Sequence, residues 1–383
     1  MSVTAATGFT ASGVVAGLKT SGKPDVALVV NSGPLFTAAG VLTGNRVKAA
    51  PVVWTQKVLA DGLLRAVILN SGGANACTGP GGFGDTVHTA ADTSALLGCE
   101  VDEVAVCSTG LIGERLAMDK LLAGVALAYS QLSAAGGAAA AEAIMTTDTV
   151  PKTAVSGDGS FVIGGMAKGA GMLAPGLATM LCVITTDAVV APEAAHEALV
   201  AATSTTFDRI DSDGCMSTND TVLLMASGAS GNAPSDADFQ RALTDVCASL
   251  ARQLIADAEG ASKDIRIEVV NAASEDEATA VARVVSRSNL LKCAIHGEDP
   301  NWGRVLSAVG TTSAAFDPDE LRVAINGVWV CEGGGVGADR DLVDLSGREV
   351  VITVDLSAGT SSSAIWTNDL TAAYVHENSA YSS

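Results

Sequence analysis

Apolar residues along this chain fall into short, β-branched runs separated by polar and glycine-containing stretches. Runs of this length and composition predict buried β-strands. The expected strands cover residues 26–30, 66–69, 104–107, 161–163, 180–185, 221–225, 265–270, 323–325 and 350–354. Because these runs recur along the whole chain, we expect β-sheet structure in all of its parts.

Helical periodicity is clearest in residues 236–256, where Ser235 and Asp238 form a capping pattern at the start. One face of this segment is apolar and carries Phe239, Leu243, Val246, Cys247, Leu250, Leu254 and Ile255. A second capping pattern at Ser274 opens a helix through Val285, directly after the strand 265–270. A strand, a helix and a later strand in this order predict a compact βαβ-like unit in the C-terminal third.

Composition places the chain among globular α/β proteins. Its 383 residues favour two domains, and a hydrophobic fraction of 48% with 17% charged residues excludes a disordered or coiled-coil chain. The formal net charge of −20 repels phosphate backbones and anionic lipids, so we expect no nucleic acid and no membrane as partner. The N-terminal segment lacks the features of a signal peptide, and no apolar run approaches the ~20 residues of a membrane span. We therefore expect a cytoplasmic enzyme.

Metal and thiol chemistry find little support in the sequence. The eight cysteines form no C-x-x-C pair, and most lie in apolar runs, where a thiol behaves as a small hydrophobic group. The four histidines are not placed at zinc-ligand spacing. Residues 169–174 match a loose glycine-rich dinucleotide pattern, but Pro175 interrupts the helix that should follow. We expect neither a metal nor a bound cofactor.

Thr179 is the candidate nucleophile, because a glycine- and proline-rich loop runs into an apolar strand at this residue. Such a loop can hold a strained peptide bond. Attack of the threonine hydroxyl on the preceding carbonyl carbon would give an ester that water can hydrolyse. The new N-terminus would then carry a hydroxyl and an α-amine whose reference pKa, about 7.7–8.0, suits a general base. The local pattern alone favours the simpler interpretation that Thr179 begins a strand.

Longer motifs extend over nearly the whole chain. In order, they are residues 70–77 (NSGGANAC), 107–113 (CSTGLIG), 144–148 (IMTTD), 168–181, 213–221 (DGCMSTNDT), 256–260 (ADAEG), 299–304 (DPNWGR) and 377–383 (ENSAYSS). Together they closely resemble the motifs of the ornithine acetyltransferase (glutamate N-acetyltransferase) family of arginine biosynthesis. The polar stretches 70–75, 213–220 and 301–304 adjoin predicted strands, and polar turns of this kind usually satisfy backbone groups, so we expect them to support the site rather than to react.

The resemblance implies roles for individual residues. Thr179 would be the nucleophile, both for cleavage of the Ala178–Thr179 bond and for acetyl transfer, and Thr109 and Gly110 would form the oxyanion hole. The implied substrate-binding residues are Thr146, Lys168, Thr179, Glu259, Asn378 and Ser383. A cation and an anion among them suit amino acids that differ in side-chain charge. From the residues alone, Glu259 is as well explained by a solvated carboxylate at a helix end, and Asn378 and Ser383 by a frayed tail.

The resemblance also implies the fold and the reaction. The fold class would be α+β, a four-layer α/β/β/α sandwich of the ornithine acetyltransferase type with a smaller C-terminal α/β unit from about residue 262. Cleavage would make residues 1–178 an α chain and residues 179–383 a β chain, joined in a heterotetramer or larger assembly. Acetyl would pass from N2-acetyl-L-ornithine to L-glutamate by a ping-pong reaction through acetyl-Thr179. Some relatives also use acetyl-CoA as a co-substrate, and the sequence leaves its use here open.

Two other functions remain open on the sequence. One is a self-processing aminopeptidase or amidase of related architecture, which would hydrolyse the acyl-enzyme. The other is an amino-acid- or carbamate-binding module that never cleaves its own chain.

Overall fold

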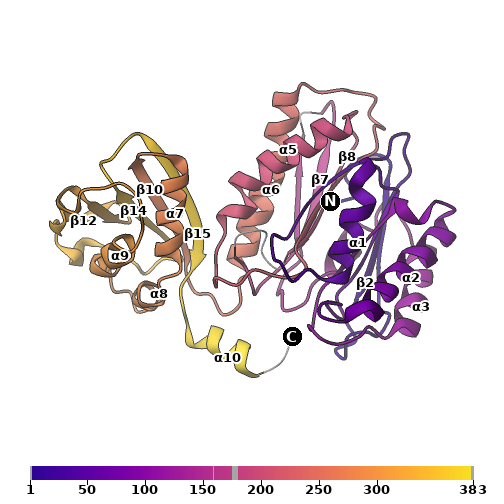
Figure 1. Ribbon diagram of the computed structural model, residues 1–383, viewed down its shortest axis with the longest axis horizontal. Coiled ribbons are helices and arrows are strands. Elements are labelled where there is room, and N and C mark those ends of the chain that lie inside the picture. The colour runs from indigo at the N-terminus through magenta and orange to yellow at the C-terminus, as the bar shows by residue number, and fades with distance from the viewer. Residues whose placement is uncertain (1, 158, 175–179, 381–383) are drawn as a thin grey trace. The chain divides into compact units, whose positions relative to one another are not determined.

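The computed structural model describes residues 2–157, 159–174 and 180–380. These residues form two compact units, one of residues 2–208 and 215–257 and the other of residues 209–214 and 258–380. Each unit contains its own β-sheet structure and helices (Figure 1). Among the described residues, no helix is both long enough and apolar enough to span a bilayer.

The first unit contains a four-stranded sheet whose last two strands are parallel. In spatial order the strands are β1 (Phe9–Val14), β2 (Val26–Asn31), β4 (Ala66–Asn70) and β5 (Val104–Ser108). Its helices are α1 (Ala50–Val58), α2 (Gly79–Leu97), α3 (Met118–Ser130) and α4 (Gly137–Ala143). Helix α1 covers the edge strand β5, because Thr55 Oγ1 donates to Val106 O at 2.7 Å and accepts from Val106 N at 3.0 Å. The backbone groups of this edge are thereby satisfied.

A five-stranded sheet forms the other half of this unit. In spatial order its strands are β3 (Thr37–Leu42), β9 (Thr221–Ala226), β8 (Leu181–Thr186), β7 (Ile163–Lys168) and β6 (Lys152–Ser156). Strands β8 and β9 are parallel, whereas β7 and β8 are antiparallel, with Lys168 opposite Leu181. The segment 169–180 therefore connects two neighbouring strands at one end of the sheet. Two helices, α5 (Pro192–Thr205) and α6 (Asp236–Ala256), pack on this sheet.

The two sheets share one apolar core. Leu28 and Ile68 of the first sheet belong to the same buried cluster as Met166, Val183 and Leu223 of the second. Helices α2 and α3 lie outside the first sheet, and α5 and α6 lie outside the second (Figure 1). The predicted α/β/β/α sandwich is confirmed.

The second unit is built on a six-stranded sheet. In spatial order its strands are β13 (Gly335–Val336), β12 (Val328–Glu332), β11 (Arg322–Ile325), β14 (Glu349–Asp355), β10 (Asp264–Ala272) and β15 (Ser361–Asn368). Its helices are α7 (Glu275–Ser286), α8 (Asn289–His296), α9 (Trp302–Val309) and α10 (Ala372–Ala380). Strands β10 and β14 are parallel and α7 follows β10, as the predicted βαβ-like unit requires.

One predicted strand is wrong. Residues 161–163 were expected as a strand that stops before Gly164 and Gly165, but β7 begins at Ile163 and continues to Lys168. Both glycines lie inside the strand. A Cβ at position 164 would lie 2.2 Å from Ser2 O, and a Cβ at position 165 would lie 3.0 Å from the Leu250 side chain. Here glycine permits close packing on the strand instead of ending it.

Candidate active site

The expected site residues divide between the two units. Ala178, Thr179 and Ser383 lie outside the described residues. The first unit contains Thr109, Gly110, Thr146 and Lys168, and the second contains Glu259 and Asn378.

The expected oxyanion residues lie where parallel strands β4 and β5 end. Thr109 directly follows β5, and its N–H donates to Asn70 O at 3.0 Å. Gly110 has a φ of 128°, and a Cβ at this position would lie 2.8 Å from Gly73 N. Only glycine accepts both this backbone conformation and this close approach. The residue type at position 110 is therefore set by the tight turn after β5.

Lys168, from the five-stranded sheet, lies beside Thr109. It is the last residue of β7 and is only 1% exposed. Its Nζ donates to Thr109 Oγ1 at 3.3 Å. The structure thus brings two of the expected site residues together, at the strand end from which the segment 169–180 departs. A buried ammonium group beside a hydroxyl forms a polar site suited to a developing negative charge.

A buried carboxylate that the residue pattern did not single out organises this corner. Asp148 Oδ1 accepts from Gly169 N and from Lys152 Nζ, both at 2.7 Å, and Oδ2 accepts from Thr146 N at 2.9 Å. Burial opposes ionisation of Asp148, but the Lys168 and Lys152 cations and these hydrogen bonds lower its pKa to about 2. Asp148 therefore ties the expected substrate residue Thr146 to the start of the 169–180 segment.

Two further cations lie at this corner. Lys152 Nζ also donates to Asp257 Oδ2, so one buried ammonium group joins two carboxylates. Lys19 Nζ donates to Met145 O at 2.6 Å, and burial, with a contribution from Lys168, lowers its pKa to about 8. Three lysine ammonium groups therefore lie close to the carboxylates of Asp148 and Asp257 at this corner.

The loop before β9 forms hydrogen bonds with residues at the start of β8 and at the end of β5. Met180 N donates to Asp220 Oδ1 at 2.9 Å. The neighbouring Asn219 donates through Nδ2 to Ala74 O at 2.6 Å and to Ser108 O at 2.8 Å. The stretch 213–220, expected as a supporting loop, thus holds both the residue after Thr179 and the residue before Thr109.

In the second unit, Glu259 and Asn378 contact each other. Asn378 Nδ2 donates to Glu259 Oε2 at 3.0 Å, and Asn378 lies in α10. Glu259 also lines a pocket of about 250 Å³, together with the acidic residues Asp213 and Asp369, the basic residues Arg287 and Lys292, and Tyr374. Such a lining suits a zwitterionic amino acid, whose ammonium and carboxylate groups need partners of opposite charge.

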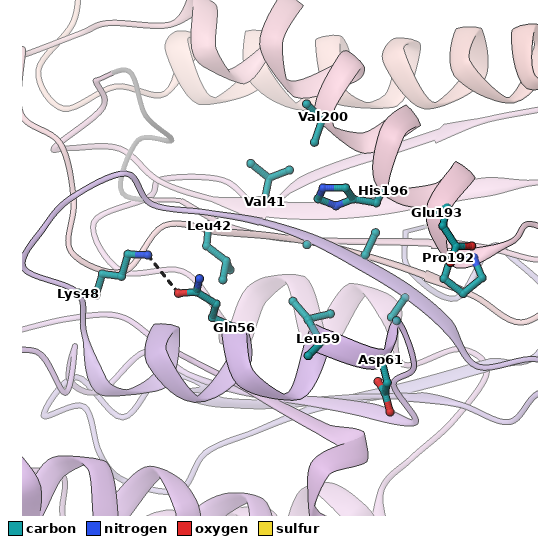
Figure 2. A pocket seen from close by; sticks show the side chains of 15 residues that line it. Val41, Leu42, Lys48, Gln56, Leu59, Asp61, Pro192, Glu193, His196 and Val200 are labelled. Carbon is teal, nitrogen blue, oxygen red and sulfur yellow. Dashed lines mark hydrogen bonds between the residues drawn. The ribbon is translucent and has the colours of Figure 1, made fainter.

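A larger pocket of the first unit lies elsewhere. It has a volume of about 610 Å³ and is bordered by β3, the C-terminal end of α1 and the start of α5 (Figure 2). Lys48 Nζ donates to Gln56 Oε1 at 3.1 Å at its rim, and His196 faces it. None of the expected site residues lines it. Among the described residues, no cluster of three or more histidine, cysteine or acidic side chains is arranged to hold a metal ion.

Comparison with known proteins agrees with the motifs. A family model described as the ArgJ family matches residues 10–383. The chain is 67% identical over 383 residues to the arginine biosynthesis bifunctional protein ArgJ of Streptomyces coelicolor, covering 100% of both chains. It is 63% identical over 382 residues to the protein of the same name from Thermobifida fusca, again covering 100% of both. A solved structure of ornithine acetyltransferase complexed with ornithine, from Mycobacterium tuberculosis, is 56% identical, covers 47% of this chain and 96% of its own, and has a TM-score of 0.43.

Proposed function

Because the chain belongs to the ArgJ family, we propose that it is a self-cleaving acetyltransferase of arginine biosynthesis, which moves an acetyl group from N2-acetyl-L-ornithine to L-glutamate. The observation that carries the proposal is the contact between the Lys168 ammonium group and the Thr109 hydroxyl. This contact lies at the strand end from which the segment with the Ala178–Thr179 bond departs.

Self-cleavage comes first. The Thr179 hydroxyl attacks the carbonyl carbon of Ala178, the carbon–nitrogen bond breaks, and the nitrogen takes up the hydroxyl proton. Water then hydrolyses the resulting ester and leaves a carboxylate on Ala178 and a free α-amine on Thr179. This amine serves as the general base for the hydroxyl of the same residue.

Acetyl transfer uses the same hydroxyl twice. Thr179 Oγ1 attacks the acetyl carbon of acetylornithine, the amine of ornithine leaves with a proton, and an acetyl ester remains. The α-amine of glutamate attacks this ester and regenerates the threonine. In both steps the Thr109 hydroxyl and the Gly110 N–H stabilise the oxyanion, an effect of about 3–4 kcal/mol per donor in acyl-transfer enzymes.

The buried charges support this chemistry. The Lys168 cation disfavours protonation of a neighbouring amine, which keeps the amine available as a base, and it offers a partner for a substrate carboxylate. Glu259 offers a carboxylate for the side-chain ammonium group of ornithine. The reaction needs no bound cofactor because the threonine carries the acetyl group. Acetyl-CoA would enter only as an alternative acetyl donor.

The proposal includes the assembly. The α chain, residues 1–178, and the β chain, residues 179–383, stay together as one folded body, and pairs of such bodies form a heterotetramer or larger assembly in the cytoplasm. The shared five-stranded sheet supports the first statement, because β3, β6 and β7 precede the cleavage point whereas β8 and β9 follow it. Native mass spectrometry measures the number of chains in the assembly.

Intact mass spectrometry of the purified protein tests the cleavage. We expect two fragments, the second beginning at Thr179, and a single chain for Thr179→Ala. Thr205→Ala, at the exposed end of α5, is the matched control and should be cleaved. The uncut wild-type chain would refute the proposal. Acetylornithine consumption that does not depend on glutamate would instead indicate an amidase.

A further inference from the structure

The pocket of about 250 Å³ in the second unit is lined by hydrogen-bond donors that the reaction described above does not use. The short stretch 287–292, where α7 ends and α8 begins, contributes Arg287, Asn289 and Lys292 to the lining. Asp213 and Glu259 come from other segments and contribute carboxylates to the same pocket. The groups that can hold an anion and the groups that can hold a cation therefore come from different segments of this unit.

Arg287 retains donors that no part of the described chain uses. Its Nε donates to Asp211 Oδ2 at 2.7 Å, and the side chain of Asp211 is fully buried. This ion pair holds the guanidinium group in place. Within the described residues, Nη1 and Nη2 of Arg287 make no hydrogen bond. A guanidinium group presents its donors in a planar fork that matches the two oxygens of a carboxylate, so both terminal nitrogens remain for a bound anion.

Lys292 differs from two other buried lysines of the chain. Lys152 and Lys263 each form an ion pair with a carboxylate. Lys292 is 6% exposed and its Nζ donates to Ser212 O and to Thr367 Oγ1, but it forms no ion pair with any described residue. Burial lowers the pKa of Lys292. An amine donates hydrogen bonds in either protonation state, so its role as a donor does not depend on its charge.

Asn289 and Glu259 have uncommitted polar atoms as well. In the part of the chain that the structure describes, the side-chain amide of Asn289 forms no hydrogen bond. Glu259 Oε2 accepts from Asn378, and its Oε1 accepts from no described residue. The volume of the pocket equals that of about eight water molecules, at about 30 Å³ each. This is room for an amino acid but not for a nucleotide.

We propose that this pocket binds an α-amino acid, whose carboxylate is held by Arg287, Asn289 and Lys292. Glu259 holds its ammonium group. The choice of an amino acid as the ligand rests on the proposed function, in which the enzyme handles glutamate and ornithine. The division of the lining supports this choice, because a zwitterion finds a partner for each of its charges. An inorganic anion such as phosphate would face the carboxylates of Asp213 and Glu259, which repel it.

Isothermal titration calorimetry of the full protein with L-glutamate and with L-ornithine, without an acetyl donor, measures this binding. Lys292→Met keeps the length of the side chain and removes the donor. We expect its Kd to be about tenfold or more above that of wild type, as for the loss of one hydrogen bond to a charged group. Asn289→Ala should raise the Kd by about threefold or more. The Asn289 side chain is exposed, so this variant decides if Lys292→Met does not fold.

Lys263→Met is the matched control. Lys263 is a buried lysine of the same unit, but it is paired with Glu298 and does not line the pocket. This variant should lower the melting temperature and leave the Kd unchanged. If wild type binds neither amino acid, if Lys292→Met and Asn289→Ala bind as wild type does, or if Lys263→Met weakens binding as much as Lys292→Met, the inference is wrong.

Steady-state kinetics distinguishes two sources of the bound amino acid. If the pocket holds a substrate, Lys292→Met should raise KM for that substrate and keep kcat within about threefold of wild type. If it holds a second molecule that does not react, KM should stay unchanged while one of two binding events in the titration weakens. Failure of the proposed function is a separate outcome, since wild type would then neither cleave itself nor transfer acetyl, and calorimetry would still measure the pocket.

Discussion

Lys152 is the residue whose replacement tests the buried charge network most directly. Its side chain is fully buried, and its ammonium group donates to Asp148 Oδ1 at 2.7 Å and to Asp257 Oδ2. In Lys152→Met the chain length is nearly unchanged while the positive charge is lost. Two carboxylates, 0% and 8% exposed in their side chains, are then left facing an apolar group.

The expected loss can be worked out in two ways. Removing one partner from a buried ion pair costs about 3–5 kcal/mol, because the remaining charge is uncompensated. Separately, a pKa of about 2 for Asp148, against about 3.9 in an unfolded chain, corresponds to roughly 2.6 kcal/mol at neutral pH. Burial raises the pKa of Asp148, whereas Lys168 and then Lys152 lower it, so Lys152 supplies only part of the lowering. We expect a loss of about 3 kcal/mol.

Thermal denaturation at pH 7 measures this loss. For a unit of this size, 1 kcal/mol shifts the melting temperature by about 2–4 °C, so Lys152→Met should melt about 6–12 °C lower than wild type. Lys120→Met, which removes an exposed lysine of α3, is the control and should change it by less than about 2 °C. Adding Asp148→Asn to Lys152→Met should cost less than the sum of the single changes, since the two groups interact. A shift for Lys152→Met no larger than that of the control would refute the reasoning.

Four further outcomes are expected. Thr109→Val should fold normally and lower kcat for acetyl transfer by about 10²–10³, measured by steady-state kinetics. Gly110→Ala should lower the melting temperature as well as activity, because φ is 128° and the new Cβ meets the backbone of Gly73. Asn378→Ala should raise KM with a change in unfolding free energy below about 0.5 kcal/mol, because its contact with Glu259 is exposed. Asp148 has a lowered pKa, so the stability that it contributes is complete above about pH 4 and is lost as the pH falls through about 2; acid titration followed by circular dichroism measures this loss.

The segments that the sequence predicted well have strong local signals. Helix α6 coincides with the predicted 236–256, and the Ser235 hydroxyl accepts from Asp238 N, as the capping pattern indicated. Three of the missed strands lack such a signal. Strands β1, β3 and β6 have the sequences FTASGV, TAAGVL and KTAVS, in which alanine, serine, threonine and glycine replace most of the large apolar residues. Their strand conformation depends on pairing with distant neighbours, which local pattern does not reveal.

The site residues likewise fall into those that the sequence identified and those that only the structure revealed. Motif resemblance named Thr109 and Lys168, and the structure shows that these residues contact each other. It did not single out Lys152, and Asp220 was only part of a polar stretch expected to support the site. The importance of both residues comes from complete burial, which depends on how two sheets pack and cannot be read from neighbouring residues in the sequence. The position of Thr179 stays a prediction.

The order of the strands in the five-stranded sheet determines how a cleaved chain can unfold and refold. Strands β7 and β8 flank the proposed cleavage point and remain paired along six residues, and β3 pairs with β9 across it in the same way. A cut chain can therefore separate only by unfolding. Refolding then requires two polypeptides to find each other, so it becomes dependent on concentration and slow. Cleavage would turn a reversible folding reaction into one that is completed only once, at synthesis.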